Sequence, residues 1–177
     1  MSTEKPFEIN IIDIHWLKNI DERNDLCAHG FLYLKIGDEI VSNKETGNWT
    51  LSSTALSLLR SIDSDYTKGD YANQLLPCCG HFFIADENEQ TVIIQGCETG
   101  IDWKIIHVDA NKIKHVLENG KEITIDKEIY KQIVFDFADK VEQFYIESEP
   151  KNIPEDEFDR KGYLTFWKEW KRLREKE

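Results

Sequence analysis

The chain has 177 residues, 40% of them hydrophobic and 11% aromatic, and a formal charge of −12 at pH 7. This length and composition indicate one folded domain with a full hydrophobic core and exclude a disordered chain. The charge argues against nucleic acid and anionic membranes as partners, because phosphate groups would be repelled. No apolar run approaches the roughly 18 residues that a membrane-spanning helix needs. The N-terminus has neither the basic nor the apolar part of a signal peptide, so we expect a cytoplasmic protein.

The N-terminal third predicts strands followed by one helix. Residues 7–16 are typical of an opening strand, residues 27–36 of a second strand, and residues 30–42 of a hairpin that turns at Gly37-Asp38. A helix is expected at 51–62. Its apolar stripe is formed by Leu51, Ala55, Leu58, Leu59 and Ile62.

Three apolar runs in the middle of the chain predict consecutive antiparallel strands at 81–85, 91–95 and 101–108. They are bounded by an acidic turn and by the segment 96–100, which begins and ends with glycine. Because the apolar residues come in runs rather than in alternation, we expect helices to cover at least one face. We expect this meander to form the middle of the fold.

The C-terminal part predicts a hairpin and two helices. Asn119-Gly120 is a strong hairpin turn between strands at 113–117 and 121–125. Asp126 is expected to cap a helix at 127–146. The apolar stripe expected for this helix is Ile129, Ile133, Phe137, Val141 and Phe144. A last helix, about 160–175, is expected to pack on the domain through Tyr163, Phe166, Trp167 and Trp170.

Together these elements predict an α+β fold in a single domain spanning residues 1–177. We expect a mostly antiparallel sheet of about six to eight strands with two or three packed helices. The oligomeric state is left open.

Thiol and imidazole groups form one candidate site. A small metal-binding protein or an enzyme would use Cys27, His29, Cys79, His81 and Cys97. Their spacing is not that of a zinc finger or ribbon, so we expect no metal, no cofactor and four reduced thiols. A nucleophilic pair of Cys78 or Cys79 with His81 lacks a third, orienting group.

Glu98 and Asp102 beside two glycines are a second candidate, as carboxylates of an acid–base or metal site. The alternative is a structural turn, in which Asp102 bonds local backbone and Trp103 joins the core. Motifs for nucleotide binding, zinc proteolysis or a nucleophile elbow are absent from the sequence.

Acidic residues form the third candidate, a surface for a basic protein. Residues 160–177 carry a net charge of +4, so residues 1–159 carry −16. Such a surface attracts a cationic macromolecule and speeds its encounter, although solubility alone also favours net charge. The partner-binding residues that we expect are Glu147, Glu149, Glu155, Asp156, Glu157, Asp159, Asp63, Asp65 and Asp70.

The small acidic α+β build and two tryptophan-containing segments support a resemblance. With Gly100-Ile101-Asp102-Trp103 and Phe166-Trp167-Lys168-Glu169-Trp170, the chain resembles bacterial immunity proteins of polymorphic or contact-dependent toxin systems. The resemblance covers the general build of the whole chain and includes no diagnostic motif. It implies a non-catalytic inhibitor that occludes the active site of a toxin, often a basic nuclease.

Overall fold

The computed structural model describes residues 5–67, 74–78, 82–96 and 99–175. These residues form three α-helices and nine strands, which confirms the α+β class and the antiparallel pairing. The strands are β1 (Phe7–His15), β2 (His29–Ile36), β3 (Glu39–Ser42), β4 (Trp49–Thr50), β5 (Phe82–Ala85), β6 (Val92–Gln95), β7 (Lys104–Asp109), β8 (Lys112–Val116) and β9 (Glu122–Asp126). The helices are the 3₁₀ turn η1 (Glu22–Asn24), α1 (Leu51–Ser61), α2 (Lys127–Glu147) and α3 (Glu157–Arg174).

The strands form three separate sheets, whereas the sequence predicts one mostly antiparallel sheet of about six to eight strands. The first sheet has the order β1-β2-β3 with β4 also paired to β2, the second is β5-β6, and the third is β7-β8-β9. The expected pairing of β6 with the following strand is wrong, because Ile101 instead pairs with Leu76. A Cβ atom at Gly100 would lie 2.4 Å from the carbonyl oxygen of Leu76. The glycine therefore permits a close backbone crossing rather than a tight turn between strands.

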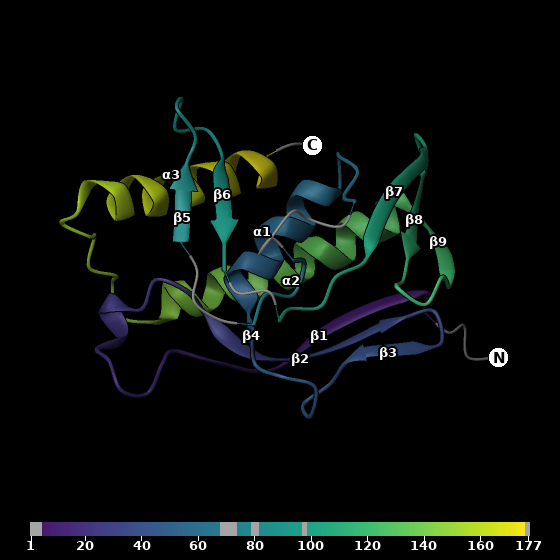
Figure 1. Cartoon of the computed structure of the whole chain (residues 1–177), viewed down its shortest axis with the longest axis horizontal. Coiled ribbons are helices and arrows are strands. Elements are labelled where there is room, and N and C mark those ends of the chain that lie inside the picture. Colours follow the sequence, from purple (N-terminus) through teal and green to yellow (C-terminus); the bar gives the residue numbers. More distant parts are fainter. Residues whose placement is uncertain (1–4, 68–73, 79–81, 97–98, 176–177) are drawn as a thin grey trace.

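The centre of the fold is α1, not the meander. Figure 1 shows the first sheet at the base, α1 and α2 above it, and the other two sheets at opposite ends. Every residue of α1 except Arg60 is buried, including its serines and Thr54. The expected apolar stripe is buried as predicted, but Leu56 on another side is buried too. A helix without charge over its first nine residues can be packed on all sides.

The helix α2 lies against β1 and α1 with a stripe that differs in part from the expected one. Asp126 caps its N-terminus as predicted, accepting from the backbone N–H of Glu128 at 3.1 Å. The buried residues are Tyr130, Val134, Phe137, Ala138 and Val141. The expectation for Ile129 is wrong, since its side chain is 55% exposed. The inward face is therefore centred on Tyr130 and Val134 rather than on Ile129 and Ile133.

The helix α3 packs through its aromatic residues, which confirms the prediction. Tyr163, Phe166 and Trp170 are buried, and Trp167 packs against the core at its edge. The Phe166 ring stacks on Phe83 of β5 with ring centroids 4.6 Å apart. A Cβ atom at Gly162 would lie 1.8 Å from the Phe83 carbonyl oxygen, so the hairpin rests directly on the helix backbone.

One buried ion pair links α1, α3 and β6. The Arg60 guanidinium donates to both carboxylate oxygens of Glu169, at 2.8 and 2.7 Å. The same carboxylate accepts from the backbone N–H of Val92 at 2.9 Å. Because Glu169 is 2% exposed, this pairing satisfies a charge that burial would otherwise penalise strongly.

Across the described ranges, no helix is long and apolar enough to cross a membrane.

Candidate functional site: an acidic pocket beside the β5–β6 hairpin

A pocket of about 290 Å³ lies where the β1–β2 connection meets β5 and the first turn of α3. Its described lining holds two carboxylates and no lysine or arginine. The lining residues are Leu17, Asn24, Asp25, Leu26, Cys27, His29, Phe82, Phe83 and Asp159. It therefore brings together residues from both the thiol–imidazole and the acidic candidates.

Asp25 forms the inner wall of this pocket and is 5% exposed. Its carboxylate accepts from the backbone N–H of Leu17 at 2.8 Å and from that of Cys27 at 3.3 Å. His29 contacts the same group through Nε2 at 3.3 Å. Burial alone would raise the pKa of Asp25, but the hydrogen bonds from His29, Leu17 and Cys27 outweigh it and lower the pKa. The pocket therefore keeps an ionised carboxylate at neutral pH.

Cys27 lies in the same pocket as a free thiol. Burial raises its pKa to about 12, so the thiol is protonated at neutral pH. A protonated thiol is neither a good nucleophile nor a metal ligand. The structure thus brings Cys27 and His29 together, but in a setting that does not activate the sulfur.

The other thiol and imidazole candidates are not placed. Cys79, His81 and Cys97 lie outside the described residues, as does Glu98. Within the described ranges, no group of three His, Cys, Asp or Glu side chains could hold a metal ion. Cys78 is disulfide-bonded, so the expectation of four reduced thiols is wrong for this residue.

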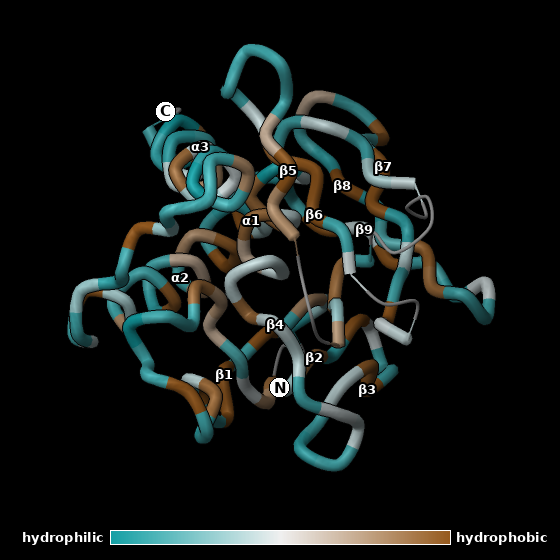
Figure 2. Tube along the Cα trace, turned by 60° about the vertical axis from the view of Figure 1, so that its left-hand side comes forward, coloured by the Kyte–Doolittle hydropathy of each residue, from teal (hydrophilic) through white to brown (hydrophobic). Residues whose placement is uncertain are grey.

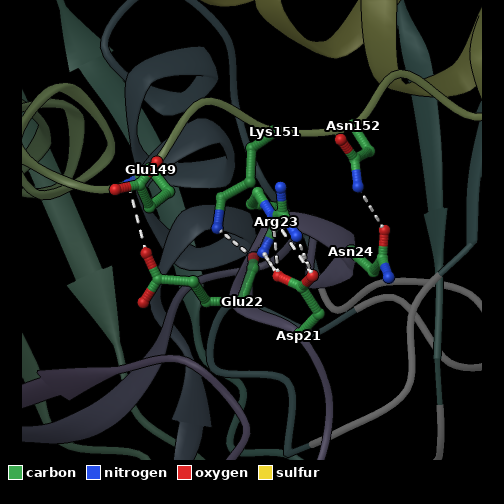
Figure 3. Close-up of polar contacts among 7 residues, drawn as sticks. All are labelled: Asp21, Glu22, Arg23, Asn24, Glu149, Lys151 and Asn152. Atoms are coloured by element: carbon green, nitrogen blue, oxygen red, sulfur yellow. Dashed lines mark hydrogen bonds and ion pairs between the residues drawn. The ribbon is translucent and has the colours of Figure 1, made fainter.

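The segment 17–27 that carries Asp25 is fixed by contacts with residues 149–152 (Figure 3). Glu22 accepts from the backbone N–H of Glu149 at 3.1 Å, and its own carbonyl accepts from the Lys151 ammonium. Asn152 donates from its backbone to Arg23 at 2.8 Å. The Lys151 ammonium also lies 3.1 Å from the centroid of one Trp16 ring. The segments 17–27 and 149–152 lie outside the strands and α-helices, so these contacts between them hold the pocket wall in place.

The acidic residues expected to bind a partner are exposed where the structure describes them, but they do not form one surface. Asp63 and Asp65 follow α1 near the start of α2, whereas Glu147 and Glu149 lie at its end. A helix of 21 residues separates the two groups by about 30 Å. Asp70 lies outside the described residues.

Several of these acids already have partners within the chain. Asp63 is 3.1 Å from the Lys127 ammonium, and Asp65 accepts from the backbone N–H of His107 at 2.7 Å. Hydrogen bonds from His107 lower the pKa of Asp65. These two residues therefore hold the α1–β5 loop to α2 and β7.

The second group meets the start of α3, which begins at Glu157 and not at residue 160. Asp156 is its N-cap and accepts from the backbone N–H groups of Phe158 and Asp159. Glu157 and Asp159 lie in the first turn, where negative charge is favourable beside the helix dipole. Asp156 therefore has a structural role at the start of the helix, and Asp159 also lines the pocket.

Asp102 is buried and accepts from the backbone N–H of Leu75 at 3.2 Å, while Trp103 is buried in the core. The structural interpretation of this turn is thus favoured, although the bonded backbone is distant in sequence rather than local.

Six residues of the pocket lining are missing from the sequence prediction: Leu17, Asn24, Asp25, Leu26, Phe82 and Phe83. Asp25 lies in a stretch that reads as a charged, exposed connection, and nothing local indicates its burial. Phe82 lies in a run that predicts a covered strand, yet it is 60% exposed. The uninterrupted apolar run Phe82-Phe83-Ile84 is the one sequence signal that could have indicated an apolar surface, because it leaves apolar side chains on both faces of the strand.

No family model, curated protein or solved structure matches this chain.

Proposed function

We propose that the chain is a non-catalytic acidic binding protein that neutralises a basic protein partner, as an immunity-type inhibitor neutralises a toxin. The observation that carries the proposal is the charge, −12 overall, with exposed carboxylates around residues 147–159. The protonated state of the Cys27 thiol supports a role without covalent catalysis.

The two groups of acids act by steering rather than by tight contact. Exposed charges change the association rate of two proteins more than the dissociation rate. Glu147, Glu149, Glu155 and Glu157 are exposed near the pocket end of the molecule, so they would raise the local concentration of a cationic partner there.

Co-expression with the product of the neighbouring open reading frame tests the proposal. We expect a stoichiometric complex with a protein of high isoelectric point, whose activity is lost in the complex. Its association rate should fall steeply with ionic strength, because exposed charges are screened over about 10 Å at 0.1 M salt. An acidic partner, or a complex formed at the same rate at every salt concentration, would contradict the proposal.

A further inference from the structure

The β5–β6 hairpin has a buried apolar face and an outer face that is apolar except at Gln95. Its register pairs Ile84 with Ile93 and Phe82 with Gln95. Successive side chains alternate between the faces, so Phe83, Val92 and Ile94 point inward and are buried. On the outer face, Phe82 is 60% and Ile93 61% exposed, with Ile84 half-buried between them.

This outer face is unusual for a surface strand pair. Figure 2 shows most of both strands of the hairpin in the hydrophobic colour, and their connecting turn in the hydrophilic colour. A half-exposed strand normally alternates apolar and polar residues. Large apolar side chains gathered on an exposed face mark an interaction surface, since leaving them in water has no benefit for the fold.

The outer face continues into the acidic pocket. Phe82 belongs to both, and Leu17, 46% exposed, lines the same pocket. Asp25 and Asp159 add the carboxylates. The opposite end of the hairpin is its turn, where Asp86, Glu87 and Glu89 follow one another closely. The apolar surface is therefore bordered by carboxylates at both ends, of which Glu89 in the turn lies 3.7 Å from the Lys161 ammonium.

Charge complementarity indicates which class of partner fits the outer face and the pocket. A second copy of this chain would bring another −12 to a face bordered by acids, and anionic lipid or nucleic acid would be repelled. At about 290 Å³ the pocket lies at the lower end of the range of ligand pockets and has room for one long side chain. A basic protein surface with an apolar residue next to a lysine or arginine matches both features.

We propose that the outer face of the β5–β6 hairpin and the Asp25 pocket together form the contact surface for the basic protein. One lysine or arginine of the partner enters the pocket beside Asp25 and Asp159, and an apolar side chain packs on Phe82 and Ile93. This inference rests on the proposed function. It replaces the acid-rich segments as the site of direct contact, while they keep the steering role.

The full chain and a synthetic peptide of alternating lysine and leucine test the surface. Backbone amide resonances of the isotope-labelled protein would be followed during titration with this peptide and with its glutamate–leucine counterpart. We expect the lysine peptide to shift resonances of 82–85, 92–95, Leu17 and Asp25, and the glutamate peptide to shift none. Shifts confined to residues 147–157 or spread over all acidic surfaces, or an absence of shifts, would overturn the inference.

Matched variants make the test specific. Ile93→Asp changes an outward side chain, and Ile40→Asp changes a similarly exposed isoleucine, 56% exposed, on β3 of a different sheet. We expect Ile93→Asp to weaken binding of the peptide and of the basic partner by at least about tenfold, as for a central contact, with Ile40→Asp near wild type. Phe82→Ser provides the same readout should Ile93→Asp fold poorly by near-ultraviolet circular dichroism.

Other outcomes separate this inference from the proposed function. A basic partner that binds the Ile93→Asp and Phe82→Ser variants as tightly as wild type overturns the surface and leaves the function standing. A wild-type dimer in sedimentation that Ile93→Asp converts to a monomer would show that a second copy covers the face, and would overturn the inference. Failure to find any basic partner would contradict the proposed function itself.

Discussion

A neutral histidine lies in the core of the molecule. His115 is fully buried, stacked on Phe7 with ring centroids 4.8 Å apart and edge-on to Tyr130. Trp103 donates from its indole N–H to Nδ1 at 3.0 Å. Burial lowers the pKa of His115 from 6.5 to about 3, because the charged form would lose its hydration. The inward position follows from strand periodicity, but no local pattern indicates that this imidazole is fully buried and neutral.

This residue makes the fold sensitive to mild acid. Between pH 6.5 and about 3 the unfolded chain binds a proton at His115 that the folded chain does not, so stability falls as pH falls. The free energy of unfolding should decrease by about 1.4 kcal/mol per pH unit in this window. Urea unfolding at several pH values measures it. His115→Gln should flatten the slope above pH 5, and an equally steep slope in this variant would contradict the assignment.

The thiols offer a second test at this scale. Cys78 is disulfide-bonded and Cys27 is free, so the denatured, unreduced protein should show fewer than the four thiols of its sequence. A coloured thiol reagent counts them before and after reduction.

Metal analysis of untagged protein should give less than about 0.1 metal per chain, since a structural zinc binds with many kcal/mol. Four thiols without reduction, or one metal per chain, would contradict the two expectations respectively.

At the scale of elements, the contact of α3 with β5 depends on one glycine. Replacing a helical glycine by alanine normally stabilises a helix by about 1 kcal/mol. At Gly162 the added Cβ would lie 1.8 Å from the Phe83 carbonyl oxygen and push the hairpin away. Gly162→Ala should therefore destabilise the protein by about 1–3 kcal/mol, as overpacking does. Thermal unfolding with Leu164→Ala on the exposed side of α3 as control measures the effect, and a stabilised Gly162→Ala protein would contradict the contact.

We expect the two neighbouring acids at the start of α3 to differ in role, with Asp156 structural and Glu155 a steering charge. Asp156→Ala should cost about 1 kcal/mol of stability because two backbone N–H groups lose their acceptor. Glu155→Ala, next to it and exposed, should change stability by less than about 0.5 kcal/mol. Chemical denaturation of both variants decides the point. Equal losses would mean that the two acids have the same role.

For the whole molecule, the sequence predicts the class and most elements but not how they assemble. Hairpins at Gly37 and Gly120 follow from local turn chemistry, and both glycines have positive φ as such turns require. The division into three sheets follows from contacts between distant residues, such as Leu76 with Ile101, which no local pattern encodes. The site shows the same limit. Asp159 and His29 can be predicted as site residues from their residue type. Asp25 becomes part of the pocket because the backbone N–H groups of Leu17 and Cys27 donate to its carboxylate.

For the whole molecule we propose a division of roles, with the exposed acids as steering charges and the outer face of the β5–β6 hairpin as the contact surface. Association and dissociation rates with the basic partner test this division most directly, at about 50 mM and about 500 mM salt. Raising the salt, or changing Glu155 and Glu157 to lysine, should slow association and leave dissociation nearly unchanged. Ile93→Asp should instead speed dissociation at both salt concentrations. An association rate indifferent to salt and to these charges, with dissociation unaffected by Ile93→Asp, would contradict the account.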